Sequence, residues 1–300
     1  AFTVTVGAQV FTETSPGILS NGGAGTGTIN YVTGALTINT DPDLAVAAVT
    51  IDFSYFPGLP VMGIFLKEEA NVNDEDTIFF DTKYAYIWNS GFAELQAGVM
   101  WDGGDADFFW AANYRGILAS DRLFFVTNNF NSATVPMRYY NGAWQPFTPG
   151  ISGATPTTAD TTFLLQAKIL IPYYGRLIAL NTQEGAALGA GANFFNRCRF
   201  SQIGDPTQAT VVGPPFVGGA WRSDVFGKGG FIDAPTNEAI VSAAFYKNTL
   251  IVFFERSTWQ LRYVGEYGLP FLWERISSDF GSESKSSPVT FDEGVLAVGD

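Results

Sequence analysis

Residues 173–180 read YYGRLIAL, and three other stretches have the same form: ASDRLFFV at 119–126, YKNTLIVF at 246–253 and FDEGVLAV at 291–298. Each stretch is a polar, turn-compatible segment followed by a short apolar run, and another apolar run precedes it. Asp, Asn and Gly favour tight turns through local hydrogen bonds or through tolerance of positive φ. Each stretch therefore predicts a β-hairpin.

Three of these units continue with an apolar–Arg–aromatic triplet, MRY, CRF or LRY, which predicts a third strand. The triplets place Arg138, Arg199 and Arg262 at matching positions in the repeat. A mid-strand arginine is seldom buried without partners. We therefore expect the stems of these arginines to lie between sheets, with the guanidinium groups on carbonyls or carboxylates. A role in ligand binding is the alternative.

The apolar runs begin at Leu123, Leu177, Leu250 and Val295, so successive units are 54, 73 and 45 residues apart, and a weaker copy begins at Thr77. Repeats of roughly 40–50 residues with four strands each are typical of β-propeller blades. Such a sheet has two apolar faces, and stacking against neighbouring sheets buries both. The sequence therefore predicts an all-β protein built as a β-propeller of about four to six blades.

The repeat covers residues 59–300, where the Gly- and Pro-rich sequence predicts an inserted loop over about 207–238. The final GVLAVGD ends in the middle of a hairpin in this register. We therefore expect a partial ring, or a last blade that is cut at residue 300. Residues 1–58 lack the repeat, and the alternating pattern at 27–39 predicts a hairpin around Thr33–Gly34. This segment is interpreted as a small N-terminal β-sandwich or hairpin module.

The composition excludes several kinds of chemistry. The chain has no histidine and one cysteine, so Ser-His-Asp catalysis, Cys-His catalysis and His-ligated metals are excluded. Cys198 is predicted to be a buried strand residue. The net charge of −13 opposes binding to nucleic-acid phosphates, but it suits a passage through which DNA slides without sticking. The longest apolar run, Leu44–Ile51, predicts no membrane span.

Two acidic clusters are candidate sites. Asp102, Asp105 and Asp107 form one, and residues 74–76 form the other. Paired carboxylates could cleave a glycan, but both clusters lie in predicted turns, where solvated aspartates are common. We therefore predict no catalytic residues and no required cofactor. Calcium is the alternative for Asp102, Asp105 and Asp107, because it binds closely spaced oxygen ligands.

The C-terminal half of the chain resembles a known family. The segments at 169–182, 196–206 and 229–265, followed by LPFLWERI and GSES, resemble the propeller-bearing nozzle or tail tubular proteins of short-tailed bacteriophages. The resemblance covers roughly residues 165–300, and residues 60–160 match only through the repeat. The N-terminal GTINYVTGALTI is similar to small β-modules of phage tail and baseplate proteins.

This resemblance implies a non-enzymatic structural protein of the virion. It implies a ring, typically hexameric, at the end of the tail, which contacts an adaptor and fibres and conducts DNA during ejection. Two alternatives remain open: a propeller that binds glycans or a receptor, and a glycan-cleaving propeller enzyme. Surface tryptophans could stack on sugars in the first alternative, and the candidates for that role are Trp101, Trp110 and Trp221.

Overall fold

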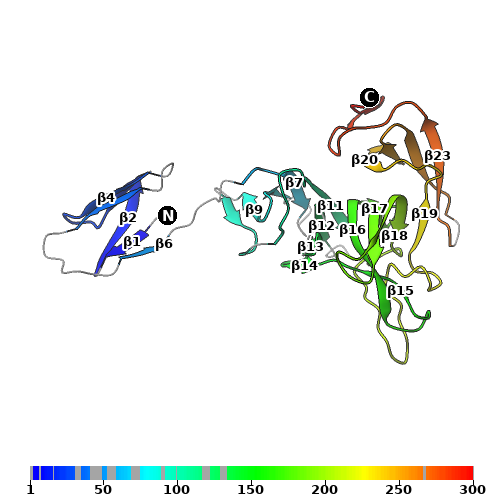
Figure 1. The fold of residues 1–300 in the computed structure, drawn as a ribbon, viewed down its shortest axis with the longest axis horizontal. Coiled ribbons are helices and arrows are strands. Elements are labelled where there is room, and N and C mark those ends of the chain that lie inside the picture. The colour runs from blue at the N-terminus through cyan, green and yellow to red at the C-terminus, as the bar shows by residue number, and fades with distance from the viewer. Residues whose placement is uncertain are drawn as a thin grey trace. The chain divides into compact units, whose positions relative to one another are not determined.

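The computed structural model describes residues 3–6, 8–15, 17–30, 35–40, 49–52, 59–68, 75–88, 92–98, 100–116, 122–128, 134–265 and 268–299. Every regular element in these ranges is a β-strand, which confirms the predicted all-β class. The chain divides into two compact units, residues 1–59 and residues 60–300. Figure 1 shows the strands of both units.

The first unit is one antiparallel sheet with strand order β5-β4-β3-β2-β1-β6. Its strands are β1 (Thr3–Val6), β2 (Gln9–Ser15), β3 (Ile18–Ser20), β4 (Thr26–Ile29), β5 (Leu36–Asn39) and β6 (Val49–Asp52). The hairpin predicted at 27–39 is confirmed, because β4 pairs with β5, although its predicted turn at Thr33–Gly34 lies outside the described residues.

Only one layer of sheet is present in the described part of this unit, so the sandwich alternative is not observed there. Val4, Val6, Phe11 and Leu19 are its buried core. They come from three strands whose apolar and polar residues largely alternate, and alternation gives a sheet a single apolar face.

The second unit contains four sheets followed by a hairpin, and within each sheet the strands follow the order of the chain. The first sheet has β7 (Gly63–Glu68), β8 (Glu75–Phe80), β9 (Ala85–Trp88) and β10 (Phe92–Glu94). The second has β11 (Phe109–Arg115), β12 (Arg122–Asn128), β13 (Met137–Tyr140) and β14 (Trp144–Pro146). The third has β15 (Gly150–Gly153), β16 (Asp160–Tyr173), β17 (Arg176–Gly185), β18 (Ala192–Phe200) and β19 (Gly230–Asp233). The fourth has β20 (Ile240–Tyr246), β21 (Thr249–Phe254), β22 (Thr258–Tyr263) and β23 (Phe271–Ser277), and the terminal hairpin has β24 (Val289–Phe291) and β25 (Gly294–Leu296).

In each sheet of the second unit, one strand contacts the corresponding strand of the next sheet, and we call the series of these contacting strands the inner edge. β7 contacts β11, β11 contacts β16, β16 contacts β20, and β20 contacts β24. With the exception of β16, which follows the additional strand β15, these are the first strands of their sheets. Four-stranded antiparallel sheets arranged in this way are propeller-like, as the repeat predicts (Figure 1).

Alternation along each strand buries both faces of the inner sheets. In β12, Phe124 packs in the core between the first and second sheets, and Phe125 packs in the core between the second and third. In β17, Leu177 faces back towards the second sheet, whereas Ile178 faces forward to the fourth. Each such side chain contributes roughly 1.5–3 kcal/mol on burial. Continuous apolar runs are therefore the sequence pattern of a sheet that is covered on both sides.

Residues 173–180 form the turn and the strand that their sequence predicts. Tyr173 pairs with Arg176, and the two residues between them, Tyr174 and Gly175, have φ values of 47° and 69°. Two positive φ values in a two-residue loop are the geometry that suits the right-handed twist of a hairpin. Glycine adopts this conformation at no steric cost, which explains its place in the phrase.

The inserted loop is shorter than predicted. Residues 230–233 form β19, where Phe231 pairs with Arg199 as the last strand of the third sheet, so the insertion covers about 201–229 instead of 207–238. The Gly- and Pro-rich composition extends to the edge of β19 and hides its start. The insertion is anchored by Trp221, which is fully buried in the core between the second and third sheets.

The aromatic core between the first and second sheets provides a test of this packing. Phe80 is fully buried and stacks on Phe109 with ring centroids 4.5 Å apart. We expect Phe80→Ala to lower the free energy of unfolding by about 3–5 kcal/mol, because it leaves a cavity between two sheets. Chemical denaturation would measure the loss. Phe195→Ala, at a residue that is 53% exposed, is the control and should cost far less; equal losses would contradict the packing described.

Candidate functional site

The three repeat arginines lie on the strands that follow the hairpins, but they do not share one orientation. The neighbours of Arg138 on β13 face the third sheet, and those of Arg199 on β18 face the fourth. Both arginines therefore lie on the opposite face of their sheet, towards the preceding sheet. The neighbours of Arg262 on β22 face the third sheet, so Arg262 lies on the opposite face of the fourth sheet, away from the third. The triplets match in sequence but pair at different places: Arg138 pairs with Val126 on β12 and Arg199 with Ala179 on β17, whereas Leu261, next to Arg262, pairs with Leu250 on β21.

Two of these arginines have simple surroundings. Arg138 is half-buried, donates to the carbonyl of Met100 over 2.9 Å, and lies over the ring of Trp101. Burial lowers the pKa of Arg138. Arg262 is exposed and forms an ion pair with Glu274, with 2.6 Å between the nitrogen and the oxygen. Exposed pairs of this kind contribute little to stability.

Arg199 belongs to a buried charge network inside the third sheet. Glu184 accepts hydrogen bonds from Arg199 at 2.9 and 2.7 Å and from Arg197 at 3.1 Å, and Arg197 also donates to both oxygens of Asp233. The guanidinium groups of both arginines lie over the ring of Phe231. Burial acts to lower the pKa of Arg197, but Asp233 and Glu184 outweigh this effect and raise it. The network joins β17, β18 and β19.

A second network holds the inserted loop. Arg222 is fully buried and donates to both oxygens of Asp224, to Asp160, and to the carbonyls of Thr155 and Thr158. Hydrogen bonding to Asp224 is the main cause that raises the pKa of Arg222. Arg222 belongs to none of the repeats or motifs in the sequence. Its one local signal is the Arg-x-Asp spacing next to a tryptophan, which is common in ordinary loops.

The aspartates considered for calcium do not form a metal site. Within the described residues, no group of three or more carboxylate, cysteine or histidine side chains is arranged to hold a metal ion. Asp102 accepts a hydrogen bond from Thr134 over 2.9 Å, and Asp107 accepts one from the backbone of Gly104 over 2.8 Å. Asp107 thus stabilises its own loop, Asp102 connects this loop to the segment before β13, and Asp105 is exposed. The calcium alternative is therefore not supported.

The second acidic cluster is divided by the start of β8. Asp76 forms an ion pair with Lys67 on β7 over 3.0 Å, and Glu75 is exposed at the first position of the strand. Asp74 lies outside the described residues. The two described carboxylates therefore belong to the edge of a hairpin and do not converge on a cleft.

The tryptophans proposed for sugar stacking are core residues or are partly buried. Trp101 and Trp221 are fully buried, and Trp110 donates its indole N–H to the carbonyl of Leu170 over 2.8 Å. This placement contradicts their use as exposed stacking platforms. Cys198 is buried in β18 as predicted, and burial raises the pKa of its thiol, which makes it a packing residue.

Apolar side chains are exposed on the first sheet, on the face opposite its core. Ile64 and Leu66 on β7 are 58% and 54% exposed, and Phe65 between them packs into the core. In the inner sheets, the corresponding positions are covered by a neighbouring sheet. The outer face of the first sheet therefore retains the apolar character of a covered face.

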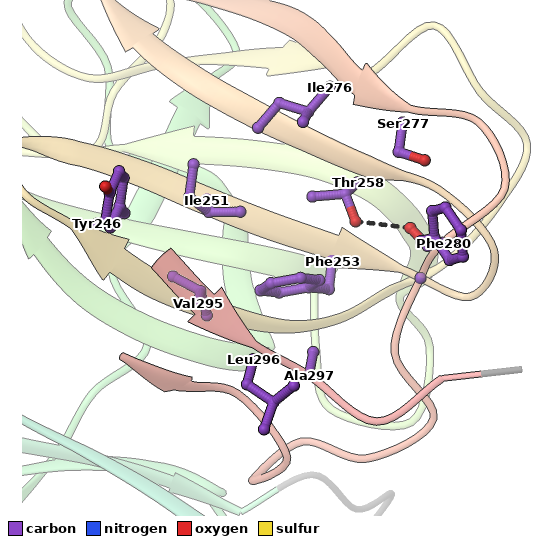
Figure 2. Close-up of a pocket in the computed structure, with 11 residues that line it drawn as sticks. Tyr246, Ile251, Phe253, Thr258, Ile276, Ser277, Phe280, Val295, Leu296 and Ala297 are labelled. Atoms are coloured by element: carbon purple, nitrogen blue, oxygen red, sulfur yellow. Dashed lines mark hydrogen bonds between the residues drawn. The ribbon is translucent and has the colours of Figure 1, made fainter. Parts of the chain in front are cut away.

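The fourth sheet is covered only in part. A cavity of about 420 Å³ lies between its outer face and the terminal hairpin. Figure 2 shows Ile251 and Phe253 of β21 on one side of this cavity, and Val295 and Leu296 of β25 on the other. Leu296 is 62% exposed, so the hairpin leaves an apolar rim.

Comparison of the sequence with protein-family models and with curated proteins gives no match. The described residues include no helix of the length and apolar character that a membrane crossing requires.

The buried network around Glu184 and the exposed pair of Arg262 with Glu274 predict different effects of mutation on stability. We expect Glu184→Gln to lower the free energy of unfolding by about 3–5 kcal/mol, because it leaves buried guanidinium charge uncompensated. Glu274→Gln removes the exposed partner of Arg262 and should cost less than about 1 kcal/mol. Chemical denaturation of both variants makes the comparison. A Glu184→Gln variant as stable as Glu274→Gln would contradict the network.

Proposed function

We propose that this protein is a structural component of the tail of a short-tailed bacteriophage. In this proposal it forms part of a ring at the tail end, lines the passage for DNA, and offers docking sites to fibres or to the host surface. The proposal begins with the sequence resemblance of residues 165–300. The observation that carries it further is the series of propeller-like sheets joined along one inner edge.

The surfaces at the two ends of the series support an assembly role. Ile64 and Leu66 expose apolar area on the first sheet, and the rim around Leu296 exposes it next to the fourth. Exposed apolar surface of this kind is typical of protein–protein contacts. A protein that packs against further sheets or subunits would use both surfaces.

The charge balance supports passage of DNA without retention. With 29 acidic and 16 basic residues, the chain carries a net charge of −13. Affinity for a polyanion comes largely from lysines and arginines that displace counterions. Four of the arginines, at positions 197, 199, 222 and 262, are engaged with carboxylates of the same chain. The surface is therefore suited to repel a duplex that slides past it.

Glycan or receptor binding remains the second proposal. Its tryptophan candidates are buried or partly buried, so it now depends on other side chains. A role in glycan cleavage is weaker still, because the two acidic clusters named for it serve loop and hairpin contacts.

Electron microscopy tests the proposed function. We expect the purified protein to form a symmetric ring, and we expect an antibody raised against it to label the tail end of virions of the source phage. Light scattering after size exclusion would give the number of subunits. Leu66→Asp adds a charge to the exposed apolar face and should weaken assembly if that face is an interface, whereas Lys83→Gln, at an exposed lysine of the same sheet, should not. A monomer without rotational symmetry, whose antibody labels no virion, would contradict the proposal.

A further inference from the structure

A second cavity, of about 350 Å³, lies on the inner side of the series of sheets. Its lining comes from the segment before β11, from β16, from β20, and from the segment before β24. β11, β16, β20 and β24 form the common inner edge of the series. The cavity therefore lies where successive sheets converge, and four separate parts of the chain build it.

Two lysines of this acidic protein line that cavity. Lys168 projects from the middle of β16, and Lys285 lies in the segment before β24. The ammonium of Lys285 donates to the backbone carbonyl of Phe108 over 2.9 Å. Within the described part of the chain, neither ammonium lies within ion-pair distance of a carboxylate. The basic partners in the two arginine networks, by contrast, are all neutralised.

The electrostatics of the pair follow from this geometry. Burial is the main cause that lowers the pKa of Lys285 to about 7, the positive charge of Lys168 lowers it further, and Asp107 acts in the opposite direction. Burial also lowers the pKa of Lys168, against a raising effect of Glu255. Glu283 lines the cavity as well. Lys168 and Lys285 are both partly buried, and two neighbouring ammonium groups repel each other unless an anion accompanies them.

We propose that this cavity binds a small divalent oxyanion, such as a phosphate or sulfate group, between the ammonium groups of Lys168 and Lys285. The lining carries two ammonium groups against the single carboxylate of Glu283, so its balance favours an anion. Ser284 and Ser286 line the same cavity and offer hydroxyl donors. Charge-assisted hydrogen bonds of this kind are stronger than neutral ones. The site depends on the geometry of the inner edge and is independent of the proposed role in a phage tail.

Isothermal titration calorimetry with sodium sulfate tests this site, because sulfate keeps the same charge from pH 6 to pH 9. Sodium chloride at equal ionic strength is the control for non-specific screening. We expect saturable binding of one sulfate at pH 6. Affinity should decrease as the pH rises above about 7, because Lys285 then loses its proton. Acetate should bind more weakly than sulfate.

Variants separate the site from general effects of charge. Lys168→Gln and Lys285→Gln should each weaken sulfate binding at pH 6 by at least about tenfold, which corresponds to roughly 1.4 kcal/mol. Lys83→Gln removes an exposed lysine of the first sheet and should leave the affinity unchanged. Lys285→Arg should retain sulfate binding up to pH 9, because a guanidinium keeps its charge there.

Three results would overturn the proposal. One is sulfate binding by both glutamine variants at the affinity of the wild-type protein. Another is a wild-type affinity that does not change between pH 6 and pH 9. The third is acetate binding as tight as sulfate binding, which would assign the cavity to a carboxylate. If a glutamine variant does not fold, the pH profiles of the wild-type protein and of Lys285→Arg decide the question.

Discussion

The whole second unit depends on one constraint: each inner sheet has two apolar faces, and a neighbouring sheet covers each of them. Strands β12 and β17 show how the chain meets it, because consecutive residues such as Phe124 and Phe125 enter different cores. A single sheet of this composition would expose a large apolar area to water. The short turns, the common inner edge and the order of the sheets all follow from the need to place the next sheet directly against the last.

The same constraint explains which features could be predicted from the sequence. Turn residues beside apolar runs identify hairpins locally, so the phrase around Tyr174 and Gly175 sufficed for the class and for the repeat. The pairing register of a strand, by contrast, is not fixed by the residues next to it in the sequence. The triplets around Arg138 and Arg262 look alike, yet the arginines point in opposite directions along the series. Met137 and Tyr139 pack towards the next sheet, whereas Leu261 and Tyr263 pack towards the preceding one. The limits of the insertion were also hidden, since the glycines at 227, 229 and 230 continue the glycine-rich composition into the start of β19.

Candidate sites were harder to predict than the fold, because they depend on contacts between distant segments. Asp102 and Asp107 are close in sequence, but they have separate partners: Asp107 accepts from the backbone of Gly104, and Asp102 accepts from Thr134 in the segment before β13. Lys168 and Lys285 are more than a hundred residues apart, and only the convergence of the inner strands brings them into one cavity. No spacing rule along the chain connects them. Asp160 was equally hard to foresee as a partner of Arg222, because it lies at the start of β16, 62 residues away along the chain.

The contacts between sheets are almost entirely between sequential neighbours, from β7 to β11 and onward to β24. Such an architecture is modular in evolution: duplication or deletion of one sheet would create or remove a single junction and leave the others unchanged. The five-stranded third sheet, with its long β16 and its inserted loop, shows how one module can be elaborated on its own. New loops can therefore be acquired by one repeat without redesign of the rest of the series.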